Sequence, residues 1–320
     1  MSTLALIALG SNLGDRKAAL DAALAALAKT SGVTVRAVSR YHETAPVGGP
    51  PGQGAFLNAA AGLETTLDPF ALHARLCQIE TEAGRQRRVR WGERTLDLDL
   101  LTYGPWILDT PELSVPHPRM AVRRFVLAPL AEIAPDARDP LTGRTISDLL
   151  ANLDRRPSYV AIRSAKAPGS LAIAREVAEK LGVEPLLRQG PADDLEALRR
   201  DAARLAERIK AGRDDPERWI VSAYHLGDEV QHWWSRQLDA IRARDDKPDR
   251  ADQETLRELR DLANAIMFAA PEPTFEVRFG DSGDRSRWLG WPYPCLSFPP
   301  GSPASAVAAE ILAACAATRS

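Results

Sequence analysis

Apolar residues in the first half of the chain follow two periods, and each period predicts one type of element. From residue 16 to about 30 the apolar positions fall at i, i+3, i+4 and i+7, which predicts an amphipathic helix that Gly32 ends. A second helix is predicted to begin at Asp68-Pro69, where an N-cap residue precedes a proline in the first helical position. Strands are predicted near residues 4–9, 33–39, 56–63 and 94–101. The resulting order, β-α-β-β-α-β, is that of the ferredoxin-like α+β motif, which is the fold class expected for this half.

The last of these strands alternates apolar and acidic residues. Leu96, Leu98 and Leu100 fall on one face of such a strand, so Asp97 and Asp99 share the other. Residues two apart on one face are about 7 Å from each other. That distance is too long for two carboxyls that share a proton, but it suits carboxylates that hold Mg²⁺ in a phosphoryl-transfer site. An ordinary amphipathic strand with a solvated acidic face is the alternative, and the alternation alone does not decide between the two.

A dense group of arginines comes directly before the acidic pair. Its members are Arg85, Arg87, Arg88, Arg90 and Arg94, with Trp91-Gly92 among them. The planar guanidinium meets phosphate oxygens two at a time, so this loop suits a polyphosphate. A nucleic-acid surface is the competing interpretation. Two carboxylates at its centre argue against it, and so do 41 basic against 43 acidic residues, which give the chain no positive field to gather nucleic acid.

Together with further motifs, these residues resemble those of the hydroxymethyldihydropterin pyrophosphokinases, and the resemblance covers about residues 3–140. It rests, in chain order, on Ala8-Leu9-Gly10-Ser11-Asn12-Leu13-Gly14-Asp15, Thr44-Ala45-Pro46-Val47-Gly48, Phe56-Leu57-Asn58-Ala59, Arg94-Thr95-Leu96-Asp97-Leu98-Asp99, Val115-Pro116-His117-Pro118-Arg119-Met120 and Arg123-Arg124-Phe125-Val126-Leu127. The family's fold agrees with the predicted element order. Its activity, the transfer of a diphosphate from ATP to a pterin alcohol, implies an enzyme of folate biosynthesis.

The resemblance also implies roles for single residues. Asp97 and Asp99 would bind two Mg²⁺ ions together with ATP, the co-substrate, and Arg85 and Arg94 would act beside them in catalysis. The ATP side would comprise Glu80, Arg87, Trp91, His117 and Arg123. The pterin side would comprise Thr44, Pro46, Val47, Phe56, Asn58 and Phe125. The implied reaction is in-line attack of the pterin hydroxyl on the β-phosphorus of ATP, with AMP as the leaving group. A pterin- or nucleotide-binding protein without turnover is the alternative.

Past about residue 150 the resemblance ends, so residues 1–155 and 156–320 are predicted to form two domains. An apolar strand at residues 158–163 leads through a loop into a helix, which is the setting of a P-loop and resembles the start of deoxynucleoside-kinase-like proteins. Ser170 and Leu171 stand where the phosphate-binding Lys and the Mg²⁺-binding hydroxyl belong. The second half is therefore predicted to be a degenerate P-loop-kinase-like α/β domain, a regulatory or interaction module with a protein partner. An unrelated helix-rich fold and a second catalytic domain are the alternatives.

Composition adds expectations about location and metals. Of the 320 residues 45% are hydrophobic, which is ordinary for a globular protein. Neither a leader pattern nor an apolar stretch of membrane-spanning length is found, so a cytoplasmic location without a membrane partner is expected. Cys77, Cys295 and Cys315 lie far apart, which predicts free thiols. His225 and His232, near two tryptophans, are expected to serve packing and surface polarity rather than a metal site.

Overall fold

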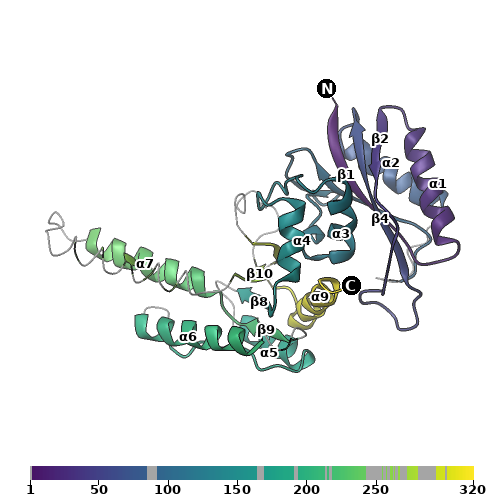
Figure 1. The fold of residues 1–320 in the computed structure, drawn as a ribbon. Helices are drawn as coiled ribbons and strands as arrows, with labels where there is room; N and C mark the ends of the chain where they lie inside the picture. Colours follow the sequence, from purple (N-terminus) through teal and green to yellow (C-terminus); the bar gives the residue numbers. More distant parts are fainter. Residues whose placement is uncertain are drawn as a thin grey trace. The chain divides into compact units, whose positions relative to one another are not determined.

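The computed structural model describes residues 2–84, 92–163, 169–190, 194–212, 215, 218–242, 254, 257, 260–261, 263, 266, 272–279, 293–299 and 301–320. They form two compact units (Figure 1). The first comprises Met1–Asp154, Gly280–Pro300 and Glu310–Ser320, and the second comprises Arg155–Phe279 and Gly301–Ala309.

An antiparallel sheet forms the centre of the first unit. Its strands follow the order β2-β4-β1-β5, and β3 pairs with the start of β4. The predicted β-α-β-β-α-β succession is confirmed, with the short strand β3 as an addition. The elements are β1 (Thr3–Ser11), α1 (Arg16–Ala28), β2 (Val33–Val38), β3 (His42–Thr44), β4 (Phe56–Thr65), α2 (Pro69–Glu82) and β5 (Asp97–Tyr103).

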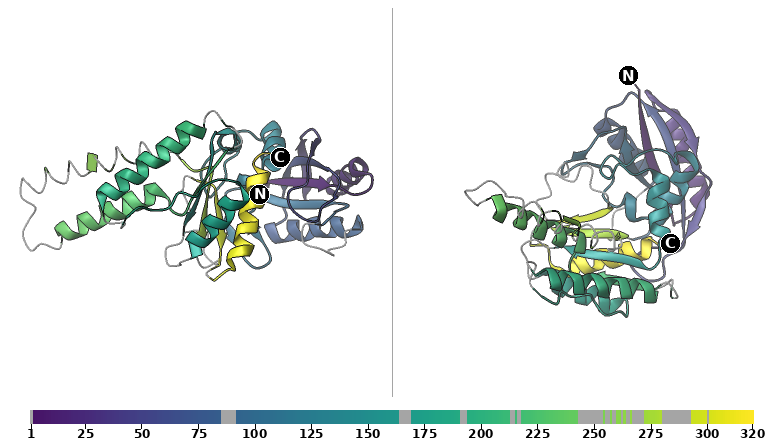
Figure 2. Two further views of the ribbon diagram at one scale, coloured as in Figure 1. Left: turned by 90° about the horizontal axis from the view of Figure 1, so that it is seen from below. Right: turned by 60° about the vertical axis from the view of Figure 1, so that its left-hand side comes forward.

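Helices cover both faces of this sheet, as the two views of Figure 2 show. On one face, apolar residues of α1 and α2 pack against alternate residues of the strands, such as Ile7 and Leu98. On the other face, Leu6 and Leu101 pack against α3 (Arg124–Ile133) and α4 (Ile146–Asp154). Since strand residues alternate between faces, Asp97 and Asp99 belong to the α3 side.

The start of α2 follows from its sequence. The Asp68 carboxylate accepts hydrogen bonds from the backbone N–H groups of Phe70 and Ala71, both at 2.9 Å, and Pro69 occupies the first helical position. This cap, as predicted, begins the helix that carries Glu80 beneath β5.

The described residues of the first unit form further elements. They are β6 (Leu108–Asp109), β7 (Ser114–Val115), the 3₁₀ turn η1 (Met120–Val122), β11 (Cys295–Phe298) and the part of α9 (Ala304–Ala317) from Glu310 onward. The structure also divides the chain after Asp154, but it groups Gly280–Pro300 and Glu310–Ser320 with the first unit, whereas the sequence assigned them to the second domain. Contacts so far apart in the chain leave no local pattern, and this explains the difference.

The second unit contains a parallel sheet in which β8 lies between β9 and β10. Its elements are β8 (Ser158–Arg163), α5 (Gly169–Lys180), α6 (Leu195–Gly212), β9 (Trp219–Ser222), α7 (Leu226–Arg242) and β10 (Phe275–Phe279). The predicted strand and the helix after it are confirmed, and so is the α/β class of this half. The loop at residues 164–168, where a P-loop would lie, is outside the described residues. Among the described residues no helix is both long and apolar enough to cross a membrane.

His225 of the second unit corrects a prediction. Its Nδ1 atom lies 3.2 Å from Asp228 Oδ2 and 3.1 Å from Glu276 Oε1, and the imidazole is buried. Arg163 and Arg278 pair with the same two carboxylates, at 2.7 and 2.8 Å. His225 thus belongs to a buried ionic cluster with equal numbers of guanidiniums and carboxylates, which the separate positions of these residues in the chain did not indicate.

Candidate active site

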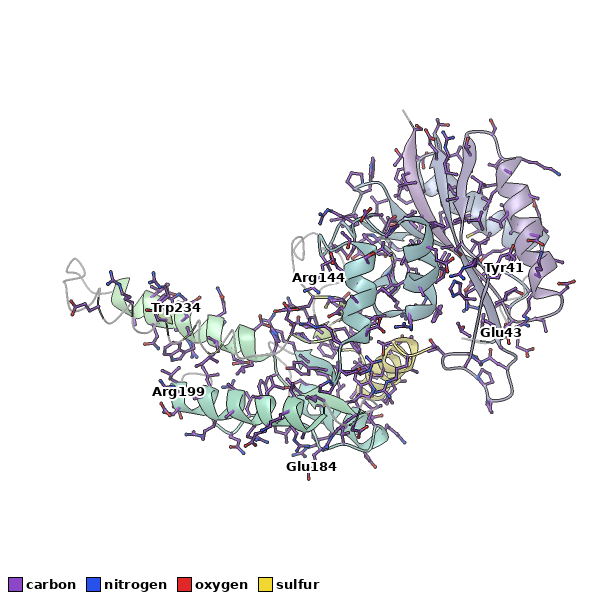
Figure 3. All side chains as sticks on the ribbon, viewed as in Figure 1. Tyr41, Glu43, Arg144, Glu184, Arg199 and Trp234 are labelled. Atoms are coloured by element: carbon purple, nitrogen blue, oxygen red, sulfur yellow. The ribbon has the colours of Figure 1, made fainter. Side chains whose placement is uncertain are left out.

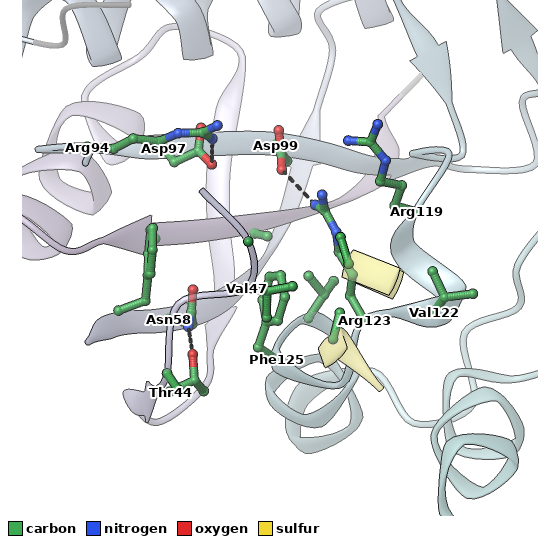
Figure 4. Close-up of a pocket in the computed structure, with 18 of the residues that line it drawn as sticks. Thr44, Val47, Asn58, Arg94, Asp97, Asp99, Arg119, Val122, Arg123 and Phe125 are labelled. Carbon is green, nitrogen blue, oxygen red and sulfur yellow. Dashed lines mark hydrogen bonds and ion pairs between the residues drawn. The ribbon is translucent and has the colours of Figure 1, made fainter. Parts of the chain in front are cut away.

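One pocket of the first unit brings together most of the predicted site residues that the structure describes (Figure 4). Strands β1, β4 and β5, the loop after β3, the start of α3 and the last turns of α9 contribute to it. The predicted residues that line it are Thr44, Val47, Phe56, Asn58, Arg94, Asp97, Asp99, Arg123 and Phe125.

Three strands form the floor of this pocket in a fixed register. Asp97 on β5 lies opposite Gly10 on β1, and Gly10 lies opposite Asn58 on β4. A Cβ atom at Gly10 would stand 3.1 Å from the Asn58 Oδ1 atom and 4.0 Å from the Asp97 Cβ atom. Glycine at this position therefore keeps the floor open between the acidic strand and the asparagine.

The two aspartates line the same pocket, as their alternation with leucines predicts. Asp97 forms an ion pair with Arg94, while Asp99 Oδ2 lies 3.8 Å from both Arg123 Nη1 and His117 Nε2. The side chains of Asp97 and Asp99 are 18% and 33% exposed, so solvent and a cation can reach both. The carboxylates of Asp97 and Asp99 are therefore the groups of this pocket that could hold a metal ion.

Arg123 lies on the opposite wall from β5, at the start of α3 (Figure 4). Burial lowers the pKa of its guanidinium, and the negative charge of Asp99 opposes that shift. Its guanidinium carbon also lies 5.5 Å from the centre of the Phe125 ring, a cation–π distance. Arg123 thus extends between the acidic strand and the aromatic side of the pocket.

The aromatic side carries a buried amide. Asn58 Nδ2 donates a hydrogen bond of 2.8 Å to the Thr44 hydroxyl, which fixes the orientation of the side-chain amide. Phe56 and Phe125 also line the pocket. Pro46 follows Thr44 in the loop after β3, but the pocket lining includes its neighbours Ala45 and Val47 instead.

Glu80 is not among the residues that line this pocket. Its side chain is buried beneath the edge strand β5, and Oε1 accepts a hydrogen bond of 2.7 Å from the backbone N–H of Leu98. Leu98 is the residue between Asp97 and Asp99. Glu80 therefore supports the acidic strand from below, and its role on the ATP side stays a prediction.

His117 is held by its backbone beside β5. Its N–H donates to the Leu101 carbonyl at 2.8 Å, and its Nδ1 atom accepts from the Arg119 N–H at 3.1 Å. The ring thereby directs Nε2 towards Asp99. The predicted residues Arg85, Arg87 and Trp91 lie outside the described residues.

Asn12 is a residue of the site that the sequence reasoning missed. Its Oδ1 atom accepts a hydrogen bond of 2.7 Å from the backbone N–H of Arg94, and the backbone N–H of Asn12 donates to the Arg94 carbonyl at 3.0 Å. Its side-chain amide also contacts the Gly54 carbonyl, at 3.4 Å. Asn12 thus connects the end of β1 to Arg94 and to the loop after β3. Its place in the Gly10-to-Gly14 turn was the available signal.

Comparisons with known proteins agree with this geometry. Residues 6–135 match the family model described as 7,8-dihydro-6-hydroxymethylpterin-pyrophosphokinase (HPPK). The chain is 53% identical to the 2-amino-4-hydroxy-6-hydroxymethyldihydropteridine pyrophosphokinase of Bacillus subtilis over 133 residues. This alignment covers 42% of this chain and 79% of that protein. The chain belongs to this family. The HPPK of Pseudomonas aeruginosa is 47% identical over 145 residues, or 45% of this chain and 88% of that protein.

The similarity to the HPPK family is confined to part of the chain. Since the family model ends at residue 135, the second unit and α9 are additions to the HPPK region. A solved structure of Plasmodium falciparum HPPK-DHPS with pterin and p-hydroxybenzoate aligns with 93% of this chain and 87% of that chain, at 11% identity and a TM-score of 0.40. A score this low supports no statement about residues 156–320.

Proposed function

We propose that the first unit transfers the diphosphate of ATP to the hydroxyl of 6-hydroxymethyl-7,8-dihydropterin in folate biosynthesis, and that AMP is released. The observation that carries this conclusion is the pocket in which Asp97 and Asp99 face Arg94 and Arg123, next to the buried amide of Asn58. It offers acidic ligands for a cation, cations for phosphate and a polar edge for a heterocycle.

The donor set suits magnesium. Two carboxylates on one strand are hard oxygen ligands, and Mg²⁺ in phosphoryl-transfer sites is commonly held by one or two of these together with substrate phosphates. Asp97 and Asp99 would hold it, and we propose two ions. When bound, Mg²⁺ neutralises phosphate charge and lowers the pKa of the attacking alcohol.

The protein side chains bind and orient the two substrates. Arg94 and Arg123, once the carboxylates pass to the metal, are free to donate to phosphate oxygens, so the same side chains neutralise the site when it is empty and bind phosphate when it is filled. Asn58 and Phe125 orient the pterin ring by hydrogen bonding and packing. Positioning and charge neutralisation supply most of the catalysis in transfers of this type.

The test is AMP formation from ATP and the pterin alcohol, measured in the full chain. Asp97→Asn and Asp99→Asn should each lower kcat by about a hundred- to a thousandfold, the effect of removing a group that stabilises transition-state charge. Asp136→Asn is the matched control, because Asp136 is an exposed residue of the same unit outside the pocket. Turnover at the wild-type rate in Asp97→Asn would refute the metal assignment.

For the second unit we infer a degenerate P-loop-kinase-like domain that does not bind ATP tightly. Support comes from the position of β8 between two parallel strands and from Ser170 and Leu171 after it. Titration of the full chain with Mg²⁺ and α,β-methylene-ATP should give one nucleotide per chain, and two tight sites would contradict the inference. The cytoplasmic location and a protein partner for this unit stay predictions.

A further inference from the structure

One wall of the substrate pocket comes from outside the HPPK region. Glu310, Ala313, Ala314 and Ala317 line the pocket, and their spacing of i, i+3, i+4 and i+7 places them on one face of α9. These residues belong to the first unit, although 175 positions separate Glu310 from the end of the family model at residue 135. The chain therefore adds a wall to a pocket that the family region otherwise builds.

This wall carries a single charged side chain among its four lining residues. The alanines have only a methyl group each, so they close the wall without filling the pocket. Glu310 Oε2 pairs with Arg119 Nη2 at 2.8 Å. The side chain of Glu310 is 9% exposed and that of Arg119 is 37% exposed. The guanidinium thus stays accessible from the pocket while its acidic partner is enclosed.

The pair with Glu310 differs from the other two ion pairs of the pocket. Arg94 and Arg123 face the two aspartates of β5, whose carboxylates are suited to a metal ion that arrives with the nucleotide. Once these carboxylates bind a metal ion, Arg94 and Arg123 can donate hydrogen bonds to phosphate oxygens. Arg119 faces a carboxylate on another wall, so its charge is already paired with that of Glu310 when a triphosphate arrives.

We propose that Glu310 sets the nucleotide affinity of the pocket by holding Arg119 until a triphosphate replaces it. The inference rests on the proposed function, which supplies the anionic substrate. It implies that Glu310 opposes ATP binding and leaves the chemical step unchanged. Loss of the Glu310 charge should lower the KM for ATP and leave kcat and the KM for the pterin alcohol near their wild-type values.

A binding experiment on the full chain isolates this effect. Calorimetric titration with Mg²⁺ and α,β-methylene-ATP, in which the bond to be broken is blocked, compares wild type, Glu310→Gln, Arg119→Ala and the double variant. Glu310→Gln should tighten binding about fivefold, the upper range for a partly exposed ion pair. In the Arg119→Ala background the same substitution should change the Kd by less than about twofold. Glu310→Asp keeps the charge and should bind within about twofold of wild type.

The matched control is Glu184→Gln. Glu184 pairs with Arg208 at 2.9 Å on the second unit, and its exposed side chain is labelled in Figure 3. This variant should bind the analogue as wild type does. Unchanged or weaker binding by Glu310→Gln would overturn the proposal, and so would a fivefold gain that persists without Arg119, which would indicate a general effect of charge. If the wild type forms no AMP from ATP and the pterin alcohol, the proposed function fails, whereas the titration still decides whether Glu310 competes for Arg119.

Discussion

The carboxylate of Glu80 holds strand β5 at the backbone of Leu98, and replacing it with leucine tests this support directly. Leucine has a similar size and keeps the buried volume filled, but it removes the acceptor of the 2.7 Å hydrogen bond. The Leu98 N–H is then left in a buried setting beneath the sheet edge. Because Leu98 lies between Asp97 and Asp99, the change disturbs the strand segment that presents both carboxylates.

The expected magnitude follows from the type of bond. A hydrogen bond to a charged group contributes about 1.5–3 kcal/mol, and an unsatisfied buried donor costs about 1–3 kcal/mol. We therefore expect a loss of about 2–3 kcal/mol in the local stability of β5. At 1.4 kcal/mol for each factor of ten, amide exchange at Leu98 should become about 30- to 150-fold faster. Glu80→Gln keeps an oxygen acceptor and should lose less than about 1 kcal/mol.

Hydrogen exchange read by mass spectrometry on peptides that contain β5 measures this effect locally, without a two-state transition of the whole chain. AMP formation in the same variants should fall in Glu80→Leu and remain near wild type in Glu80→Gln. The control is Glu82→Leu, an exposed position of α2 two residues further on. Exchange at the wild-type rate in Glu80→Leu would refute the argument that Glu80 supports the acidic strand.

Two further predictions concern pH and the pocket floor. Hydrogen bonds from the side chain and the backbone N–H of Arg40 lower the pKa of Glu132 from its ordinary 4.5 to about 2, so this contribution to stability is present above pH 4.5 and is lost as the pH falls towards 2. The urea midpoint of Glu132→Gln should therefore lie below that of wild type at neutral pH, and the difference should shrink on acidification; a constant difference would contradict the cause. Gly10→Ala places a methyl group 3.1 Å from Asn58 Oδ1 and should raise the KM for the pterin alcohol about fivefold. The control is Gly62→Ala, whose new methyl group would have its nearest contact at 3.8 Å and should leave this KM unchanged. Equal KM values in the two variants would refute the role of Gly10.

Much of the fold of the first unit could be predicted from the sequence, because its signals are local. The 3.6-residue and two-residue periods, together with the cap at Asp68-Pro69, identified the elements and their order. The alternation around Asp97 and Asp99 also gave the face that each side chain occupies, since that depends only on strand geometry. The motifs of the first half then named most of the described pocket lining.

Only the tertiary structure decided which polar groups meet across long stretches of chain. Glu80 supports Leu98, Asn12 binds the backbone of Arg94, and Glu310 pairs with Arg119. The hydrogen-bond partner of a buried polar group depends on which element packs beside it, and no periodic pattern records that choice. The sequence by itself therefore determined the elements, the acidic face and the chemistry of this protein, while the packing of distant segments decided how the acidic strand is held and which residues complete the pocket.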